Sequence, residues 1–511
     1  MYSSRRPTLS RRGVVMASAA SAMMGRVSLA RNATQGTPSV EPNGDRSPSH
    51  LLVGISGGLF DDLMYPEVTS FDASFNEVGT LRVNDGVMTV HPTGDPDLMV
   101  ITTMSDAGLF DIEANELVAI DWGNVDWEMF LAQWSLGILS TSYGEVRSSE
   151  WLISATFDAS AVLAVNLKTR EGYDITEFVN QNNQELVAVR PTYMPEGSLA
   201  GLWTGDNVYL IDLEGPEGAR RLVGDDTELY STTFDIDPTG TWCSYTTYDP
   251  STEDGEGHVY IENVMSGEYI PVTDGTAWSQ VTFIPADPSS FLLIANGSVE
   301  LRSVDEPQAA GNELAEVHEE THFKSLWDAS GARHLLGTRA DRDAPVEWII
   351  VDTAGEVSTA LPELQGLEPL MVTAAQPAPA YLLFGLNGNE PGPVLSLDLE
   401  TGEVTAYLEG AILGSPATYS SSADGRWYFL STVNRGDVRG AWLIDNLERQ
   451  VHEMPWGDGL YTLAGAIVPD GSVAAITTVE RPSDAVMTHS VDLRNPTVLE
   501  PLAPGHVLGW S

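Results

Sequence analysis

The chain has 511 residues, 42% of them hydrophobic, which is enough for a large buried core and excludes a globally disordered protein. Its formal net charge of −48, from 73 acidic and 25 basic residues, repels phosphate groups, so nucleic acid is excluded as a general partner and adhesion to anionic membranes is disfavoured. The single cysteine, Cys243, excludes an intrachain disulfide.

Residues 1–30 have the features of an export signal. The run Ser10-Arg11-Arg12-Gly13-Val14-Val15 follows a basic start, and the apolar stretch after it ends at Met24, too short to span a bilayer. This run resembles the twin-arginine export motif, which implies transport of a folded protein to the periplasm, the cell surface or the medium. Residues 31–50, rich in Asn, Thr, Ser, Pro and Gly, are expected to form a flexible linker. We expect no integral membrane segment in the mature chain, because no later stretch reaches the length needed to span a bilayer.

From residue 51 onward, a strand pattern recurs about every 46 residues. Each copy ends an alternating apolar run with an acidic or amide residue between aliphatic ones, and a Gly-containing turn often follows. The nine copies are centred on Asp111, Asn166, Asp212, Glu262-Asn263, Asp305, Asp352, Asp398, Asp445 and Asp492. An Asp or Asn at a strand end is expected to accept hydrogen bonds from nearby backbone N–H groups and so to start the turn.

An earlier turn in most units carries Gly together with Pro or Asp. Examples are Asp237-Pro238-Thr239-Gly240, Ser422-Ala423-Asp424-Gly425 and Val468-Pro469-Asp470-Gly471, in which the glycine is expected at positive φ. These turns resemble the Ser-Pro-Asp-Gly repeats of TolB-like and WD-repeat-like β-propellers, over about residues 85–511.

A single all-β propeller of four-stranded blades is therefore predicted over residues 51–511. A four-stranded unit has two apolar faces, and both are buried only when sister units stand beside it in a ring. We expect eight blades, with seven and nine as alternatives, because the unit at residues 123–183 is overlong and lacks the Pro/Gly turn. Residues 51–86 and the terminal run Gly505–Trp510 are expected to pair and close the ring.

Three short segments match or resemble motifs of metal-binding or catalytic sites, but none lies in the predicted secondary structure that its motif requires. His318-Glu319-Glu320-Thr321-His322 matches HExxH, which binds zinc through two histidines on one helical face. The segment lies between two predicted strands, so we interpret the match at His318, Glu319 and His322 as coincidental and predict no metal and no cofactor. Gly54–Gly58 matches GxSxG without a strand–turn–helix context. The acidic run Asp249–Gly255 is interpreted as a solvated loop.

Acids and tryptophans recur where a fourth strand leads to the next first strand. Aromatic faces stack on sugar CH groups and carboxylates accept hydroxyl protons, so this set is the candidate binding site at one mouth of the ring. Its members are Trp122, Asp126, Trp127, Asp225, Asp274, Trp278, Trp456 and Asp458, with Asp121 and Asp226 beside them. The alternative is that the tryptophans fill gaps between blades and the acids are ordinary surface residues.

No coherent catalytic set is present, so the sequence favours an exported, non-catalytic, monomeric propeller. It would bind a protein, a peptide or a glycan through one face of the ring. The alternative is an extracytoplasmic carbohydrate-active enzyme, a hydrolase or lyase using two carboxylates at the mouth. A passive scaffold of the cell envelope is a third possibility.

Overall fold

The fold was analysed in a computed structural model. It describes residues 50–55, 65–92, 97–103, 107–121, 139–140, 151–156, 162–179, 190–193, 198–204, 207–222, 230–249, 256–276, 279–318, 321–328, 330–340, 344–369, 380–386, 392–399, 401–412, 416–422, 426–434, 437–468 and 470–510. The predicted signal at residues 1–30 and nearly all of the predicted linker at residues 31–50 lie outside these ranges.

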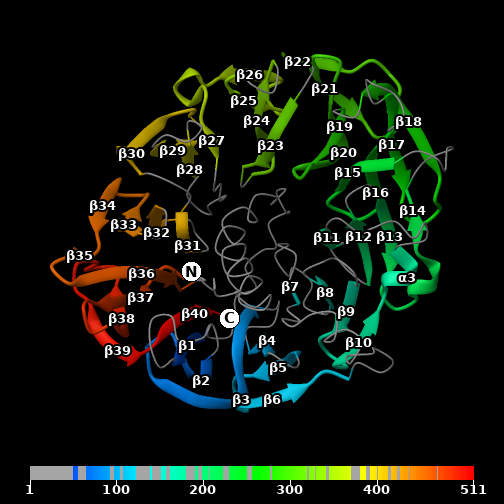
Figure 1. The fold of residues 1–511 in the computed structure, drawn as a ribbon. Coiled ribbons are helices and arrows are strands. Elements are labelled where there is room, and N and C mark those ends of the chain that lie inside the picture. The colour runs from blue at the N-terminus through cyan, green and yellow to red at the C-terminus, as the bar shows by residue number, and fades with distance from the viewer. Residues whose placement is uncertain are drawn as a thin grey trace, which may run out of the picture.

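The chain forms a single β-propeller. Nine antiparallel sheets are hydrogen-bonded among the described residues, and Figure 1 shows them arranged around a ring in chain order. Within a sheet the strands follow one another from the inside of the ring to the outside, as β15 to β18 show. Between residues 50 and 510, no helix in the described parts has the length and apolar character needed to cross a membrane.

The strands and their bounds, sheet by sheet, are as follows. The first sheet has the order β40 (His506–Trp510), β1 (Leu51–Ile55), β2 (Tyr65–Phe71), β3 (Glu77–Pro92), β4 (Leu98–Thr103), β5 (Ala107–Asp111) and β6 (Glu116–Ala119). The next three are β7 (Leu139–Ser140), β8 (Trp151–Thr156), β9 (Val162–Asn166) and β10 (Glu171–Asp174); β11 (Arg190–Tyr193), β12 (Leu199–Trp203), β13 (Val208–Asp212) and β14 (Arg220–Arg221); and β15 (Tyr230–Ile236), β16 (Trp242–Tyr248), β17 (Glu256–Asn263) and β18 (Tyr269–Thr276).

The remaining five sheets follow the same plan. Two of them are β19 (Gln280–Ile284), β20 (Asp287–Ala295), β21 (Ser298–Ser303) and β22 (Asn312–Glu316), and β23 (Thr321–Trp327), β24 (Arg333–Arg339), β25 (Glu347–Asp352) and β26 (Val357–Ala360). The next two are β27 (Glu368–Pro369), β28 (Ala380–Leu386), β29 (Gly392–Asp398) and β30 (Val404–Ile412), and β31 (Pro416–Ser421), β32 (Trp427–Asn434), β33 (Asp437–Asp445) and β34 (Gln450–Glu453). The last sheet has five strands, β35 (Trp456–Gly457), β36 (Leu460–Ile467), β37 (Val473–Glu480), β38 (Ala485–Asp492) and β39 (Glu500–Pro504). The short helices are α3 (Thr176–Val179), η1 (Pro216–Gly218) and η2 (Pro362–Leu364).

The ring is closed by pairing the two ends of the chain. Strand β40 lies antiparallel to β1, with Leu51 opposite Trp510 and Gly54 opposite His506. The pairing predicted between residues 51–86 and the terminal run is therefore confirmed. The C-terminal strand takes the innermost position of a sheet whose outer strands come from the N-terminal end.

The predicted number of eight blades stays a prediction. Seven sheets have four strands, one has five and one has seven. The seven-stranded sheet is continuous through the long strand β3, which pairs with β2 mainly through residues 77–82 and with β4 through residues 87–92. A count of sheets and a count of four-stranded units therefore differ at this point of the ring.

The core lies between neighbouring sheets, as expected for units with two apolar faces. One cluster joins Trp151 and Val162 of one sheet to Leu202 and Tyr209 of the next. A second cluster unites buried side chains of β32 and β33 with those of β37 and β38. Each sheet thus buries an apolar face against its neighbour, and the hydrophobic effect stabilises the ring as a whole.

The turn chemistry expected from the repeats is confirmed. Asp398 at the end of β29 accepts a hydrogen bond from the backbone N–H of Thr401 at 3.1 Å, and Gly402 follows with φ of +74°. In the earlier turn, Asp237 Oδ1 accepts the N–H of Trp242 at 2.6 Å, and Gly240 has φ of +70°. An acidic side chain and a left-handed glycine thus define these hairpins together.

Candidate functional site

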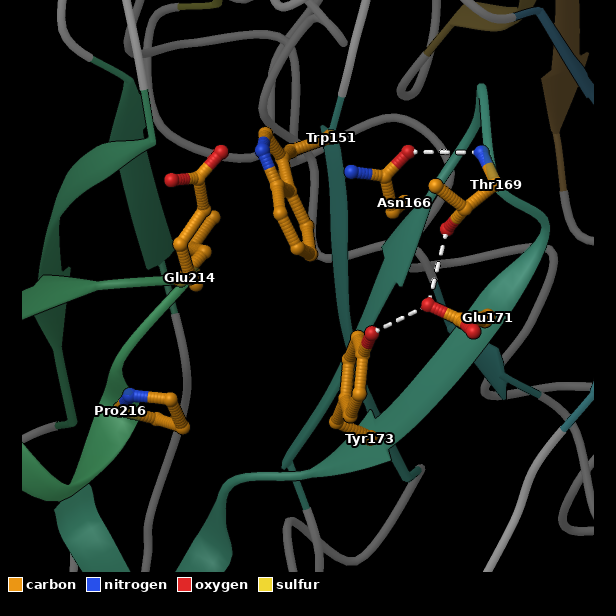
Figure 2. A pocket seen from close by; sticks show the side chains of 8 residues that line it. Trp151, Asn166, Thr169, Glu171, Tyr173, Glu214 and Pro216 are labelled. Carbon is orange, nitrogen blue, oxygen red and sulfur yellow. Dashed lines mark hydrogen bonds between the residues drawn. The ribbon is translucent and has the colours of Figure 1, made fainter.

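A pocket of about 200 Å³ opens between the sheet β7–β10 and the sheet β11–β14. Figure 2 shows its two walls facing each other, with Glu214 and Pro216 on one side and Glu171 and Tyr173 on the other. The side chains that line it are Trp151, Asn166, Thr169, Glu171, Tyr173, Leu213, Glu214 and Pro216. The pocket is smaller than a drug-sized site, so it has room for about one small ring.

The first wall is formed by the turn between β9 and β10. Asn166 ends β9, and its Oδ1 accepts the backbone N–H groups of Lys168 and Thr169, both at 2.9 Å. Because side chains of a strand alternate between its two faces, Glu171 and Tyr173 at the start of β10 lie on the same face. The repeat that sets the turn therefore also sets the direction of both pocket side chains.

The Glu171 carboxylate is held in place by two hydroxyl groups. Its Oε2 accepts hydrogen bonds from Tyr173 OH at 2.8 Å and from Thr169 Oγ1 at 3.2 Å (Figure 2). The bond to Glu171 raises the pKa of the Tyr173 phenol, and burial and the carboxylates of Glu171 and Asp121 add to the rise. The phenol therefore remains protonated at neutral pH and remains a hydrogen-bond donor.

The second wall is formed by the turn after β13. Asp212 Oδ1 accepts the backbone N–H of Glu214 at 3.1 Å and the Ser198 hydroxyl at 2.5 Å. Pro216 then begins the short helix η1. Glu214 is exposed, and within the described parts of the chain its carboxylate has no hydrogen-bond or ion-pair partner. It is therefore an anionic group available to a ligand.

The inner part of the pocket is buried and apolar. Trp151 is 2% exposed and Leu213 is 3% exposed, and both belong to the core cluster between the two sheets. The Trp151 and Tyr173 rings are tilted by 39° with centroids 6.2 Å apart. Tyr173 is 38% exposed, so it offers an aromatic surface that is supported from behind by the core.

A neighbouring segment fixes the outer edge of β10. The N–H of Asp121 donates to the carbonyl of Arg170 at 2.9 Å, and the N–H of Gly172 donates to the carbonyl of Asp121 at 2.7 Å. Asp121 follows β6, so the backbone that carries Glu171 is bonded to the preceding sheet. The backbone of the wall that carries Glu171 is thus held by hydrogen bonds from two sheets, which lowers the cost of ordering it on binding.

This arrangement suits a small neutral or cationic ring. Two carboxylates accept hydrogen bonds, and aromatic surface packs against C–H groups. No Lys or Arg is among the lining residues that the structure describes, so an anionic ligand would meet repulsion without a compensating positive charge.

Five of the predicted site residues lie outside the described residues. They are Trp122, Asp126, Trp127, Asp225 and Trp278. Asp274 lies in β18, with its backbone opposite His258. The structure therefore does not bring these residues together into a described site, and their role in binding stays a prediction.

Trp456 and Asp458 lie on one tight hairpin. Strand β35 pairs with β36, with Trp456 opposite Tyr461, and the two rings meet edge to face at 5.2 Å. Asp458 and Gly459 have φ of +51° and +90°, the left-handed pair required by a two-residue hairpin turn. The hairpin lies toward the outside of the ring in Figure 1, and ligand binding there stays a prediction.

The HExxH match does not lie on a helix where the structure describes it. His318 follows β22, and its Nε2 lies 3.2 Å from Glu347 Oε2 of the next sheet. His322 is part of β23, and Glu319 lies outside the described residues. Within the described ranges, no group of three or more His, Cys, Asp or Glu side chains is arranged to hold a metal ion.

The pocket residues were not in the predicted site. Glu171, Tyr173 and Glu214 stand at turns between third and fourth strands, which the sequence pattern explained as hairpin chemistry alone. The predicted set instead follows the fourth strands. An aromatic and an acidic residue at alternate positions, as in Glu171-Gly172-Tyr173, is the one local signal that could have pointed to this wall.

Among family models and curated proteins, no match to the chain was found. Solved structures with a similar fold include an oligogalacturonate lyase from Vibrio parahaemolyticus, 12% identical, covering 59% of this chain and 88% of that one with a TM-score of 0.39. A eukaryotic initiation factor is 12% identical and covers 80% of this chain and 96% of that one with a TM-score of 0.47. The β-propeller domain of Cps50 (Swd1) from Myceliophteria thermophila is 14% identical and covers 59% and 95%, with a TM-score of 0.32. These likenesses concern the fold, and no residue role is transferred from them.

Proposed function

We propose that this protein is an exported, non-catalytic β-propeller that binds a glycan in the pocket between the sheets β7–β10 and β11–β14. The observation that carries the proposal is the pairing of aromatic surface with carboxylates in a space of sugar size. The twin-arginine signal at residues 1–30, the linker at residues 31–50, the likeness to TolB-like propellers and a monomeric state are parts of the same proposal.

Binding would use the two walls in different ways. A pyranose ring would pack its C–H face on Tyr173, because aromatic rings attract polarised C–H groups. Its hydroxyls would donate to the carboxylates of Glu171 and Glu214, which accept but do not donate when ionised. Since Glu171 is already fixed by Thr169 and Tyr173, little side-chain entropy is lost on binding.

A carbohydrate-active enzyme is the second candidate, because two carboxylates stand on opposite walls of the pocket. Glycoside hydrolysis requires one of the two to act as a general acid, which usually depends on an apolar setting. Glu171 and Glu214 are both exposed to water, and this favours binding over hydrolysis.

An array of neutral and amino oligosaccharides, followed by calorimetry with the sugar that binds, tests the proposal. Tyr173→Ala should weaken binding by about tenfold or more through the loss of stacking surface, with an unchanged circular-dichroism spectrum. Glu448→Gln is the matched control, since Glu448 is an exposed acid in the equivalent turn of the sheet β31–β34.

The variant Trp456→Ala tests whether the ligand binds at the hairpin of Trp456 instead of in this pocket. Loss of binding in Trp456→Ala with full binding in Tyr173→Ala would move the site to that hairpin. An array without any bound sugar would contradict the glycan proposal, and release of reducing ends that stops in Glu171→Gln or Glu214→Gln would favour the enzyme.

A further inference from the structure

We propose that the pocket selects a sugar with a free primary ammonium group, a hexosamine that is not N-acetylated. This inference rests on the proposed function, because it names the ligand class of the same pocket. Its basis is the distribution of charge and hydrogen-bonding capacity among the side chains that line the two walls.

Each of the two walls contributes one carboxylate to the lining of the pocket. Glu171 comes from one sheet and Glu214 from the next, and both carboxylates line the same space of about 200 Å³ (Figure 2). An ammonium group has three N–H donors and no acceptor, so it can donate to the carboxylate of the wall that it faces. An acetamide at the same position has one N–H donor and adds an acceptor that faces an anion.

The hydrogen bonds inside the pocket leave acceptor capacity for a ligand. Thr169 and Tyr173 both donate to Oε2 of Glu171, so Oε1 of the same carboxylate is not used by either. Glu214 contributes a second carboxylate that no described residue engages. An incoming cation therefore meets a fixed anion on one wall and an available one on the other.

The basic side chains near the pocket are not among its lining residues. The Arg170 guanidinium, in the turn that carries Glu171, lies 4.0 Å from Asp111 Oδ2 of the preceding sheet. Arg220, on the wall that carries Glu214, forms an ion pair with Glu262 of the following sheet. Lys168 is exposed in the β9–β10 turn and does not line the pocket. The charged side chains among the described lining residues are thus the two carboxylates.

The aromatic residues favour the same ligand. Tyr173 is exposed beside Glu171, and the Trp151 ring supports it at a centroid distance of 6.2 Å. Aromatic faces attract cations, and a carbon next to an ammonium group carries part of its positive charge. Stacking and ion pairing therefore act on one aminated ring at once, whereas a neutral ring gains only the stacking and a uronate is repelled.

Calorimetry with three disaccharides of equal length tests the selectivity: one built from glucosamine, one from N-acetylglucosamine and one from glucose. The intact protein should bind the glucosamine disaccharide about tenfold more tightly than the other two, which is the effect of one charge-assisted hydrogen bond. Added salt should reduce this preference, because it screens charges at an exposed site.

Two variants distinguish specific binding in the pocket from non-specific attraction of an amine to the acidic protein. Glu214→Gln should lower the preference for the amine severalfold. Glu448→Gln removes the same charge from the equivalent turn of the sheet β31–β34 and should leave the preference unchanged. A preference that falls equally in both variants would show non-specific attraction to a chain of net charge −48 and would overturn the inference.

The outcomes distinguish this inference from the proposed function. Equal affinity for the three disaccharides, with loss of all binding in Tyr173→Ala, would overturn the selectivity and leave the glycan-binding proposal in place. Absence of binding to all three disaccharides and to longer oligosaccharides of each kind would contradict both.

Discussion

Trp510 lies opposite Leu51, so a residue at the very end of the chain is paired with the first strand of the ring. The Trp510 side chain is 8% exposed, and its indole N–H donates to the carbonyl of Ala466 in the adjacent sheet at 3.2 Å. The closing contact therefore consists of backbone pairing and of side-chain packing between two sheets.

Removal of the closing strand is expected to destabilise the whole ring. Deletion of residues 505–511 removes the innermost strand of a sheet and exposes the core that Leu51 and Val53 share with Val468, so we expect the melting temperature to fall by several degrees. Trp510→Ala alone should lower the free energy of unfolding by about 3–5 kcal/mol. Calorimetric melting of both proteins measures this, and an unchanged melting temperature after the deletion would contradict the closure.

Local features of this fold were predictable because they depend on neighbours in sequence. The acceptor role expected of Asp398 is formed with a backbone N–H three residues away, and the positive φ expected in the Asp237–Gly240 turn is found at Gly240. One copy of the pattern differs in register: Asn263, and not Glu262, accepts the N–H groups of the turn. Glu262 is buried and pairs with Tyr245 and with Arg220 of the preceding sheet.

The pocket could not be predicted from the same pattern. Tyr173 and Glu214 belong to different units, and they meet only because two sheets stand side by side in the ring. A sequence repeat indicates which residues occupy equivalent positions in the units. It does not indicate where neighbouring sheets leave a pocket between them. The acids and tryptophans that recur in the sequence follow the fourth strands, whereas the pocket forms at turns between third and fourth strands.

Asp445 combines a turn with an ion pair, and its substitution should separate the two contributions. Its Oδ1 accepts the N–H groups of Leu447 and Glu448, both at 3.1 Å, and its Oδ2 accepts from Arg426 at 2.7 Å. Asp445→Ala should lower the free energy of unfolding by about 2–3 kcal/mol, because the side chain is 3% exposed and both the turn N–H groups and Arg426 lose their acceptor.

Asp445→Asn is the matched variant. Asn166 performs the same turn role with its amide oxygen, so the asparagine should keep the turn and lose only the charge of the pair with Arg426. Chemical denaturation of both variants measures the difference. Equal losses for the alanine and asparagine variants would assign the stabilisation to the ion pair and not to the turn.

His334 should make the protein sensitive to acid. Its ring is fully buried, stacks on Trp327 at 4.4 Å and has no hydrogen-bond partner among the described residues. Burial lowers the pKa of the imidazole to about 3. The unfolded chain takes up a proton near pH 6.5 while the folded one does not, so stability is present above pH 6.5 and is lost progressively toward pH 3.

The loss attributable to His334 should reach about 2 kcal/mol at pH 5. His334→Phe keeps an aromatic ring against Trp327 and removes the titrating group, so its free energy of unfolding should fall less between pH 7 and pH 5 than that of the unsubstituted protein. Denaturant titrations at the two pH values measure this. Parallel pH profiles of the two proteins would show that His334 does not contribute.

Asp235 should produce the opposite dependence on pH. This half-buried residue of β15 accepts the N–H of Phe283 in the next sheet and the N–H of Ile236, both at 2.9 Å. Burial raises the pKa of its carboxyl from 3.8 to about 7. The folded state therefore keeps a proton that the unfolded chain releases, and stability falls as pH rises from about 4 to 7 and is then constant.

Because solvent reaches part of the side chain, we expect a loss of about 2 kcal/mol between pH 5 and pH 8. Asp235→Asn removes the titrating group and keeps an oxygen acceptor for one of the two N–H groups, so it should flatten this part of the profile, whereas Asp470→Asn, at an exposed turn, should not. Denaturant titrations at pH 5 and pH 8 compare the three proteins, and an Asp235→Asn profile as steep as that of Asp470→Asn would assign the dependence to other groups.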